Sequence, residues 1–128
     1  MKSVCIVDDD SIYVMLAKRL ISLNRLSDDV CEFSEGREAF QGLKQRIDKG
    51  EHLPDVIFLD VNMPIWDGWD FLDEFSKLEI SKRPEIYIVT SSTHSLDLEK
   101  AATYPIVSRC LTKPLELDDL KTILQGSI

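Results

Sequence analysis

The fold of this chain is decided by the stretch PDVIFLDVNMPIWDG, which runs from Pro54 to Gly68. Its apolar part, Val56–Leu59, is continuous rather than alternating, as in a strand buried on both faces of a parallel sheet. The apolar run ends on Asp60, and turn-forming residues follow it. An acidic side chain is therefore expected where a buried strand leaves the sheet, at the edge where open α/β sheets bind ligands.

Strands and helices are predicted to alternate along the whole chain. The expected strands are Val4–Val7, Val30–Phe33, Val56–Leu59, Ile86–Val89 and Ile106–Leu111. The expected helices lie between Ser11 and Asn24, from about Glu35 to Asp48, from Gly68 to Leu78, from about Ser95 to Ala102, and from Leu117 to about Gln125. This alternation indicates an α/β fold, a parallel sheet covered by helices on both faces. Right-handed crossovers then place every strand-to-helix loop at one edge.

The first two helices have recognisable caps and apolar stripes. Asp10 or Ser11 is the expected cap of the first helix, and Ser34 that of the second. Apolar residues at spacings of three and four predict the buried face of the first helix: Ile12, Met15, Leu16, Leu20 and Leu23. The corresponding stripe of the second helix is Ala39, Phe40, Leu43 and Ile47.

Length and charge narrow the class of protein. The 128 residues suggest one domain, which buries about 70% of its unfolded surface. The net charge of -8 argues against nucleic-acid binding, which needs a basic footprint. No apolar run approaches membrane-spanning length, and the first is too short for a signal peptide. We expect one domain over residues 1–128 without an output domain, which binds neither nucleic acid nor membranes.

The cysteines indicate a reducing environment. Cys5, Cys31 and Cys110 are an odd number, contain no CxxC pair, and lie in apolar strand-like segments. They are expected to be buried free thiols of a cytoplasmic protein. A zinc site is not expected, because neither histidine has ligand-like spacing to a cysteine.

Polar residues gather in the loops that follow four of the strands: Asp8–Asp10, Asp60, Thr90–Thr93 and Lys113. Three clustered carboxylates would repel one another and raise one another's pKa, and a hard divalent cation such as Mg²⁺ relieves this. Asp10 is expected to cap the helix, which leaves Asp8, Asp9 and Asp60 for the metal.

Asp60 is either a metal ligand only or a nucleophile that forms an aspartyl phosphate. In the second case Lys113 would neutralise the phosphoryl charge, and Thr90 would offer a hydroxyl. The alternatives are a solvated surface lysine and a threonine that simply ends a strand.

Four motifs in order resemble the receiver domain of two-component response regulators, over essentially the full chain. The motifs are Val7-Asp8-Asp9, Leu59-Asp60 with Asn62-Met63-Pro64 and Asp67-Gly68, Val89-Thr90-Ser91, and Lys113-Pro114. The resemblance is to single-domain receivers of the chemotaxis type. It implies a flavodoxin-like (βα)5 three-layer sandwich with strand order 2-1-3-4-5.

The resemblance also implies a role for each site residue. Asp60 is expected to be the phosphoacceptor. Asp9 would bind Mg²⁺ directly, Asp8 through water, and Asn62 through its backbone carbonyl.

On the same grounds, Thr90 would bond the phosphoryl group and Lys113 would pair with it. A cis peptide bond is expected between Lys113 and Pro114, and Ser91 is small, as the family requires beside the phosphoryl group.

The implied function is phosphorelay signalling. The donor would be a phosphohistidine on a sensor histidine kinase or phosphotransfer protein, and the modified chain, a monomer or weak homodimer, would bind an unknown downstream protein. It would be a switch rather than an enzyme, catalysing only its own phosphorylation and dephosphorylation.

One departure from the family pattern is Cys110, which stands where an aromatic switch residue is usual, three positions before Lys113. The signal is then expected to pass through the loop after Thr90 and the helix beyond it.

The departure keeps a second interpretation open, a degenerate receiver that docks proteins without phosphorylation.

Two other classes of protein fit the sequence less well. A dehalogenase-like phosphohydrolase needs a second acid at Asn62, and a nucleotide-binding domain needs a glycine-rich first loop.

Overall fold

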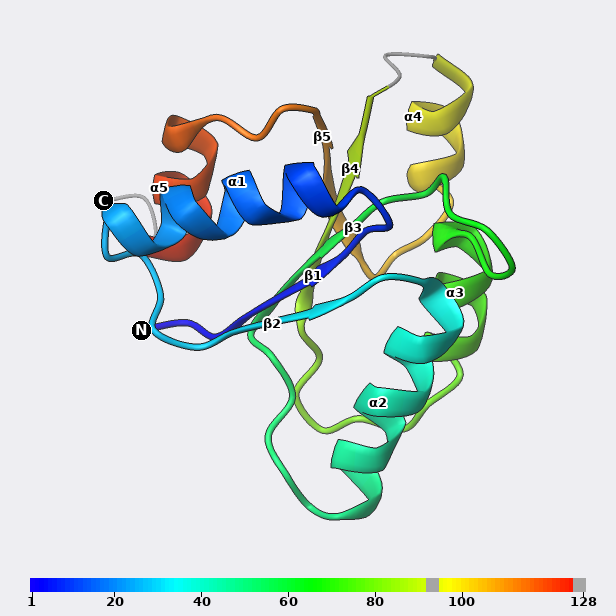
Figure 1. The fold of residues 1–128 in the computed structure, drawn as a ribbon. Helices are drawn as coiled ribbons and strands as arrows, with labels where there is room; N and C mark the ends of the chain where they lie inside the picture. Colours follow the sequence, from blue (N-terminus) through cyan, green and yellow to red (C-terminus); the bar gives the residue numbers. More distant parts are fainter. Residues whose placement is uncertain (92–94, 126–128) are drawn as a thin grey trace.

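Five parallel strands form a single sheet in the order β2-β1-β3-β4-β5 (Figure 1). The computed structural model describes residues 1–91 and 95–125. The strands are β1 (Val4–Val7), β2 (Val30–Phe33), β3 (Val56–Leu59), β4 (Glu85–Thr90) and β5 (Val107–Thr112). The predicted sheet and its order are confirmed, and the last two strands begin and end within a residue of their predicted bounds.

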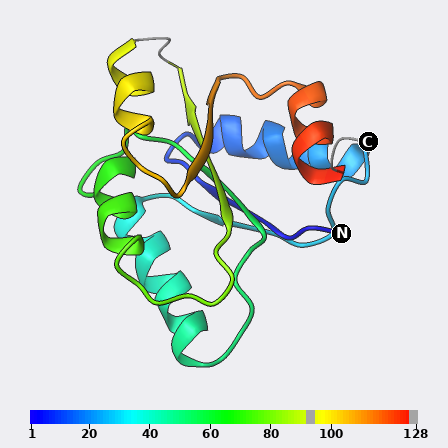
Figure 2. The ribbon, with the colours of Figure 1, turned by 180° about the vertical axis from the view of Figure 1, so that it is seen from behind.

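Helices cover both faces of the sheet. They are α1 (Ser11–Leu23), α2 (Gly36–Asp48), α3 (Gly68–Phe75), α4 (Ser95–Ala101) and α5 (Leu117–Gln125). Helices α1 and α5 lie on one face, and α2, α3 and α4 lie on the other, as the two opposite views show (Figures 1 and 2). The three-layer arrangement predicted from the sequence is therefore confirmed.

Each face of the sheet has its own apolar core. Ile6 and Phe58 point toward α1 and α5, whereas their neighbours Cys5 and Ile57 point toward α2 and α3. Successive side chains of a strand alternate between faces, so a strand buried on both sides must be apolar throughout. This explains why Val56–Leu59 reads as an uninterrupted apolar run.

The predicted buried face of α1 is wrong. Four of its five residues are exposed: Ile12 (66%), Met15 (56%), Leu16 (53%) and Leu23 (73%). The residues that face the sheet are Tyr13, Val14, Ala17 and Ile21. Leu20 alone of the predicted set packs partly against the core. The predicted and the observed buried residues both recur with helical spacing. The small side chain of Ala17 is consistent with close approach of the observed buried face to the sheet.

Two helix ends also differ from expectation. Glu35, not Ser34, is the N-cap residue of α2, and its side chain makes no capping hydrogen bond. Helix α3 ends at Phe75 rather than at Leu78. The guanidinium group of Arg83 donates hydrogen bonds to the carbonyls of Phe75 and Leu78, which satisfies backbone groups at this end without a further helical turn. Among the described residues, no helix has the length and apolar character needed to cross a membrane.

Candidate functional site

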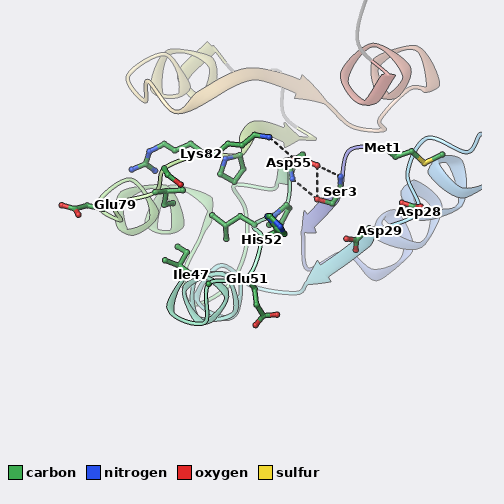
Figure 3. Close-up of a pocket in the computed structure, with 17 residues that line it drawn as sticks. Met1, Ser3, Asp28, Asp29, Ile47, Glu51, His52, Asp55, Glu79 and Lys82 are labelled. Atoms are coloured by element: carbon green, nitrogen blue, oxygen red, sulfur yellow. Dashed lines mark hydrogen bonds and ion pairs between the residues drawn. The ribbon is translucent and has the colours of Figure 1, made fainter.

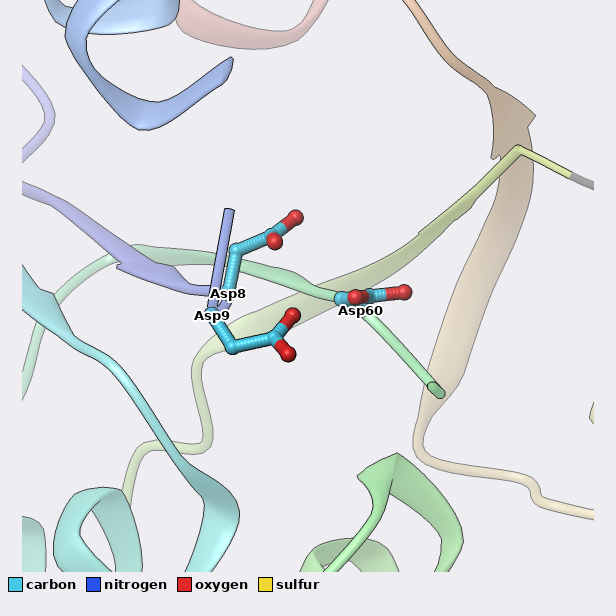
Figure 4. Close-up of side chains that lie close together, drawn as sticks. All are labelled: Asp8, Asp9 and Asp60. Carbon is cyan, nitrogen blue, oxygen red and sulfur yellow. The ribbon is translucent and has the colours of Figure 1, made fainter. Parts of the chain in front are cut away.

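Three carboxylates meet at the carboxyl edge of the sheet. Asp8 and Asp9 follow β1, and Asp60 follows β3, its direct neighbour. The Val7↔Leu59 register brings these strand ends side by side, and the Asp60 amide donates a 2.9 Å hydrogen bond to the Val7 carbonyl. One carboxylate oxygen from each acid lies within 4.8 Å of the other two (Figure 4). The predicted convergence of these acids is confirmed.

Lys113 enters the same cluster from the loop after β5. Its Nζ lies 2.8 Å from Asp8 Oδ2 and 3.7 Å from Asp60 Oδ2. Burial alone would lower the pKa of Lys113, but its contact with Asp8 and the charge of Asp60 outweigh burial and raise that pKa. The lysine is therefore a permanent cation inside the cluster, not a solvated surface residue.

Asp60 is held in an environment that disfavours its charged form. Its side chain is 5% exposed, and this burial is the main reason that the pKa of Asp60 rises from 3.8 to about 6. The Asn62 amide donates a 3.2 Å hydrogen bond to Asp60 Oδ1 and opposes the rise, as does Lys113, while Asp8 adds to it. The cluster thus contains three carboxylates and one ammonium group, and a second cation would relieve the remaining repulsion.

The donor set fits a hard divalent cation. All three candidate ligands offer carboxylate oxygens, which Mg²⁺ and similar ions prefer. Asp8 and Asp60 are buried and Asp9 is exposed, so the cluster opens to solvent on the Asp9 side. Among the described residues, these three form the only such group of potential ligands.

Asp10 belongs to the helix rather than to the cluster. Its side chain accepts hydrogen bonds from the amides of Ile12 and Tyr13, at 3.1 Å and 3.2 Å, and caps α1. The Asp10 amide in turn donates a 2.9 Å bond to Asp8 Oδ1. The predicted role of Asp10 as the cap of α1 is confirmed, and its amide helps to orient the carboxylate of Asp8.

Thr90 ends β4 at the same edge of the sheet. It is buried, and its carbonyl accepts a 2.9 Å hydrogen bond from the amide of Lys113. The predicted cis peptide bond between Lys113 and Pro114 is present. Ser91 is exposed, whereas residues 92–94, the rest of the predicted loop, lie outside the described residues. The backbone therefore couples the ends of β4 and β5 next to the acidic cluster.

Cys110 lies on β5 opposite Ile88 of β4 and is half-buried. Burial raises the pKa of its thiol above the usual value, so this cysteine is a neutral, small side chain. Of the three cysteines predicted to be buried, only Cys5 is fully so.

Two residues have a part in the site that was not predicted from the sequence. The ring of Tyr13 lies 4.4 Å beneath Lys113 Nζ, and burial raises the pKa of its hydroxyl, keeping it neutral. Its position one turn after the Asp10 cap was the available signal. Gly68 is the second: a Cβ at this position would lie 2.5 Å from the carbonyl oxygen of Asp60. Only glycine allows α3 to begin so close to the phosphoacceptor candidate.

A hollow of about 640 Å³ lies at the opposite edge of the sheet, near the amino ends of the strands (Figure 3). Asp55 accepts a 2.8 Å hydrogen bond from the Ser3 amide there and has Lys82 3.9 Å away. These contacts link the segments that precede β1, β3 and β4. Since the convergent carboxylates lie at the other edge, this hollow is not the candidate site.

Comparison with known proteins places the chain in a family. The model of the response regulator receiver domain matches residues 4–125. The response regulator Rcp1 of Synechocystis is 28% identical and covers 98% of this chain and 85% of its own. A two-component response regulator from Cytophaga hutchinsonii has a similar structure, with a TM-score of 0.85, 25% identity, and coverage of 98% and 97% of the two chains.

A structure described as the Mn²⁺-bound form of Rcp1 also has this fold, with a TM-score of 0.75, 24% identity, and coverage of 98% and 91%. The chain belongs to the response regulator receiver domain family. Receiver domains are signalling switches of phosphorelays, and they interact with histidine kinases or phosphotransfer proteins. The chain thus functions in phosphorelay signal transduction, and its acidic cluster is compatible with a divalent metal ion.

Proposed function

We propose that Asp60 is the residue that accepts the phosphoryl group, in a Mg²⁺-dependent reaction with a phosphohistidine of a kinase or phosphotransfer protein in the cytoplasm. The observation that carries this proposal is the convergence of Asp8, Asp9 and Asp60 within 4.8 Å, with Lys113 inside the cluster. Asp60 is the acid that follows the central, fully buried strand β3, so its position is fixed from both faces of the sheet.

Each side chain has a distinct part in the proposed reaction. A carboxylate oxygen of Asp60 attacks phosphorus, and the bond between phosphorus and the donor histidine breaks. Lys113 neutralises charge on the transferred group, and the Thr90 hydroxyl donates a hydrogen bond to it. Asp8, Asp9, Asp60 and the backbone carbonyl of Asn62 would hold Mg²⁺, which when bound offsets the negative charge of the phosphoryl oxygens.

The output of the switch is proposed to be a change in binding to another protein. Cys110 has no aromatic ring that could turn between an exposed and a buried position, so we propose that the change passes through the segment after Thr90 and α4. Hydrogen exchange with and without phosphorylation tests this: altered exchange in α4 is expected. Change confined to the loop after Asp60 would contradict it.

Intact mass after incubation with acetyl phosphate tests the phosphoacceptor. We expect a gain of one phosphoryl group that requires Mg²⁺ and is absent from Asp60→Asn. Asp48→Asn is the matched control, because Asp48 is an exposed carboxylate at the end of α2. This variant should react like the unmodified protein.

The second candidate function is docking without phosphorylation, which Cys110 keeps open. It predicts no gain of mass under any of these conditions, although the protein is folded. A gain that persists in Asp60→Asn would instead mean that another residue accepts the phosphoryl group.

A further inference from the structure

Two of the three cysteines lie directly opposite each other on neighbouring strands. Cys5 of β1 is paired with Cys31 of β2 in the parallel register, and both side chains point toward the α2 face of the sheet. Cys5 is completely buried, whereas Cys31 is half-buried, because β2 is the edge strand. The Cys31 thiol is therefore partly accessible from solvent, whereas the Cys5 thiol is enclosed in the core beside it.

The strand geometry suits a bond between them. Neighbouring strands of a sheet lie about 4.8 Å apart, which falls within the range of about 4.4 to 6.8 Å between the Cα atoms of disulfide-bonded cysteines. The two side chains also leave the sheet on the same face. The Cα spacing required for a disulfide between Cys5 and Cys31 is therefore available without a change of strand register.

The two thiols differ in reactivity. Hydrogen bonding with Cys5 is the main cause that lowers the pKa of Cys31 to about 7, and the Arg46 guanidinium of α2 lowers it further. Burial and the charge of Asp29 oppose this effect. The same contact with Cys31, together with burial, raises the pKa of Cys5. Cys31 is thus about half ionised at neutral pH, whereas Cys5 keeps its proton.

We propose that Cys31 is a peroxide-reactive thiol and Cys5 its resolving partner, so that a hydroperoxide links β1 to the edge strand β2 by a disulfide. The Cys31 thiolate attacks one oxygen of the hydroperoxide, the O–O bond breaks, and Cys31 becomes a sulfenic acid. The leaving hydroxide or alkoxide takes a proton from solvent. The sulfur of Cys5 then attacks that of Cys31, the S–O bond breaks, and water leaves with the proton of Cys5. Two thiols are oxidised, and one hydroperoxide is reduced to water or an alcohol.

The test uses the full chain, reduced and folded, with hydrogen peroxide in small excess. After the reaction, the protein is unfolded in iodoacetamide, and the intact mass and the peptides are measured. We expect loss of two hydrogen atoms, alkylation of Cys110 only, and a peptide that joins Cys5 to Cys31. Alkylation of all three cysteines, or a disulfide that includes Cys110, would overturn the proposal.

Variants distinguish the two roles. Cys110→Ser should still form the disulfide, and Cys31→Ser should protect Cys5 from peroxide. Cys5→Ala should stop at the sulfenic acid, which dimedone traps on Cys31. If Cys5→Ala perturbs the fold, circular dichroism shows it, and the Cys31→Ser result alone decides: oxidation of Cys5 in that variant contradicts the proposed order.

Arg46 provides an independent test. The pH profile of Cys31 alkylation should shift to higher pH in Arg46→Gln, with a several-fold slower reaction at neutral pH, and Arg46→Lys should restore much of the rate. Lys44→Gln is the matched control, since Lys44 is an exposed cation on the same helix. An unchanged profile in Arg46→Gln would contradict the assigned part of Arg46. None of these measurements involves phosphorylation, so they stand apart from the proposed function of Asp60.

Discussion

At the scale of single residues, Asp60 is held in an environment that favours its neutral form. Burial raises the pKa of Asp60 from 3.8 to about 6, so between those values the folded protein binds a proton that the unfolded chain does not. The free energy of unfolding therefore falls as pH rises through this window. A buried carboxylate that lowers stability is consistent with selection for reactivity rather than for folding.

This pH dependence of the free energy of unfolding leads to a prediction for Asp60→Asn, measured without divalent metal. Asparagine resembles the neutral acid, so the variant should be more stable than the unmodified protein at about pH 7.5, by about 1 to 3 kcal/mol. Well below pH 3.8, where the acid is protonated in both states, the difference should vanish. Urea unfolding in the presence of a chelator measures both values. A variant that is less stable at neutral pH would contradict the raised pKa.

Ile65 is a second residue with an unfavourable setting. It lies in the loop after Asp60 with φ of 67°, and its side chain is 72% exposed. A β-branched residue in this left-handed region costs about 1–2 kcal/mol. We expect Ile65→Asn to raise the free energy of unfolding by about 1 kcal/mol, because asparagine tolerates this conformation. Ile65→Val keeps the branch and should show no gain in the same unfolding experiment.

At the scale of elements, α1 shows where local pattern is insufficient. Two apolar stripes share the helix, and its sequence alone does not say which one faces the sheet. The Asp10 cap and the packing of α1 against α5 and the sheet determine which stripe is buried. The buried stripe consists of Tyr13, Val14, Ala17 and Ile21. The bounds of β1 and β3 were predicted correctly, by contrast, because a strand buried on both faces must be apolar throughout.

The orientation of α1 can be tested with two variants. Ile21→Ala removes a completely buried side chain and should cost about 2–5 kcal/mol. Met15→Gln replaces an exposed side chain with one of similar helix propensity and should change the free energy of unfolding by less than about 0.5 kcal/mol. If urea unfolding showed a larger loss of stability for Met15→Gln than for Ile21→Ala, the face predicted from the sequence would be the buried one.

At the scale of the whole molecule, the acidic cluster links metal binding to folding. A cation that binds only the folded state stabilises it by about 2.7 kcal/mol at 100 times its dissociation constant. We expect added Mg²⁺ to raise the melting temperature of the protein. In Asp9→Asn the stabilisation by Mg²⁺ should be largely lost.

The exposure of Asp9 makes this variant informative, because its stability without metal should change by less than about 1 kcal/mol. Melting curves over a series of Mg²⁺ concentrations measure both quantities. An equal response in the two proteins would remove Asp9 from the proposed ligand set.

The carboxyl edge of the sheet was predictable because it depends on strand ends and on the handedness of crossovers, which are encoded locally. Asp8, Asp9, Asp60 and Lys113 are accordingly brought together as the sequence indicated. The contact of Tyr13 with Lys113 and the approach of Gly68 to Asp60 depend on exact distances between elements. Such distances follow from packing of the whole domain and leave no local pattern.

The pairing of β1 with β3 has a consequence for quality control in the cell. Asp8 and Asp60 are far apart along the chain and meet only when these strands pair in register. An unfolded or half-made chain therefore contains the acids but no assembled metal and phosphoryl site. Under the proposed chemistry, a kinase transfers phosphoryl groups only to molecules that have completed the central sheet, so incomplete molecules do not compete for its signal.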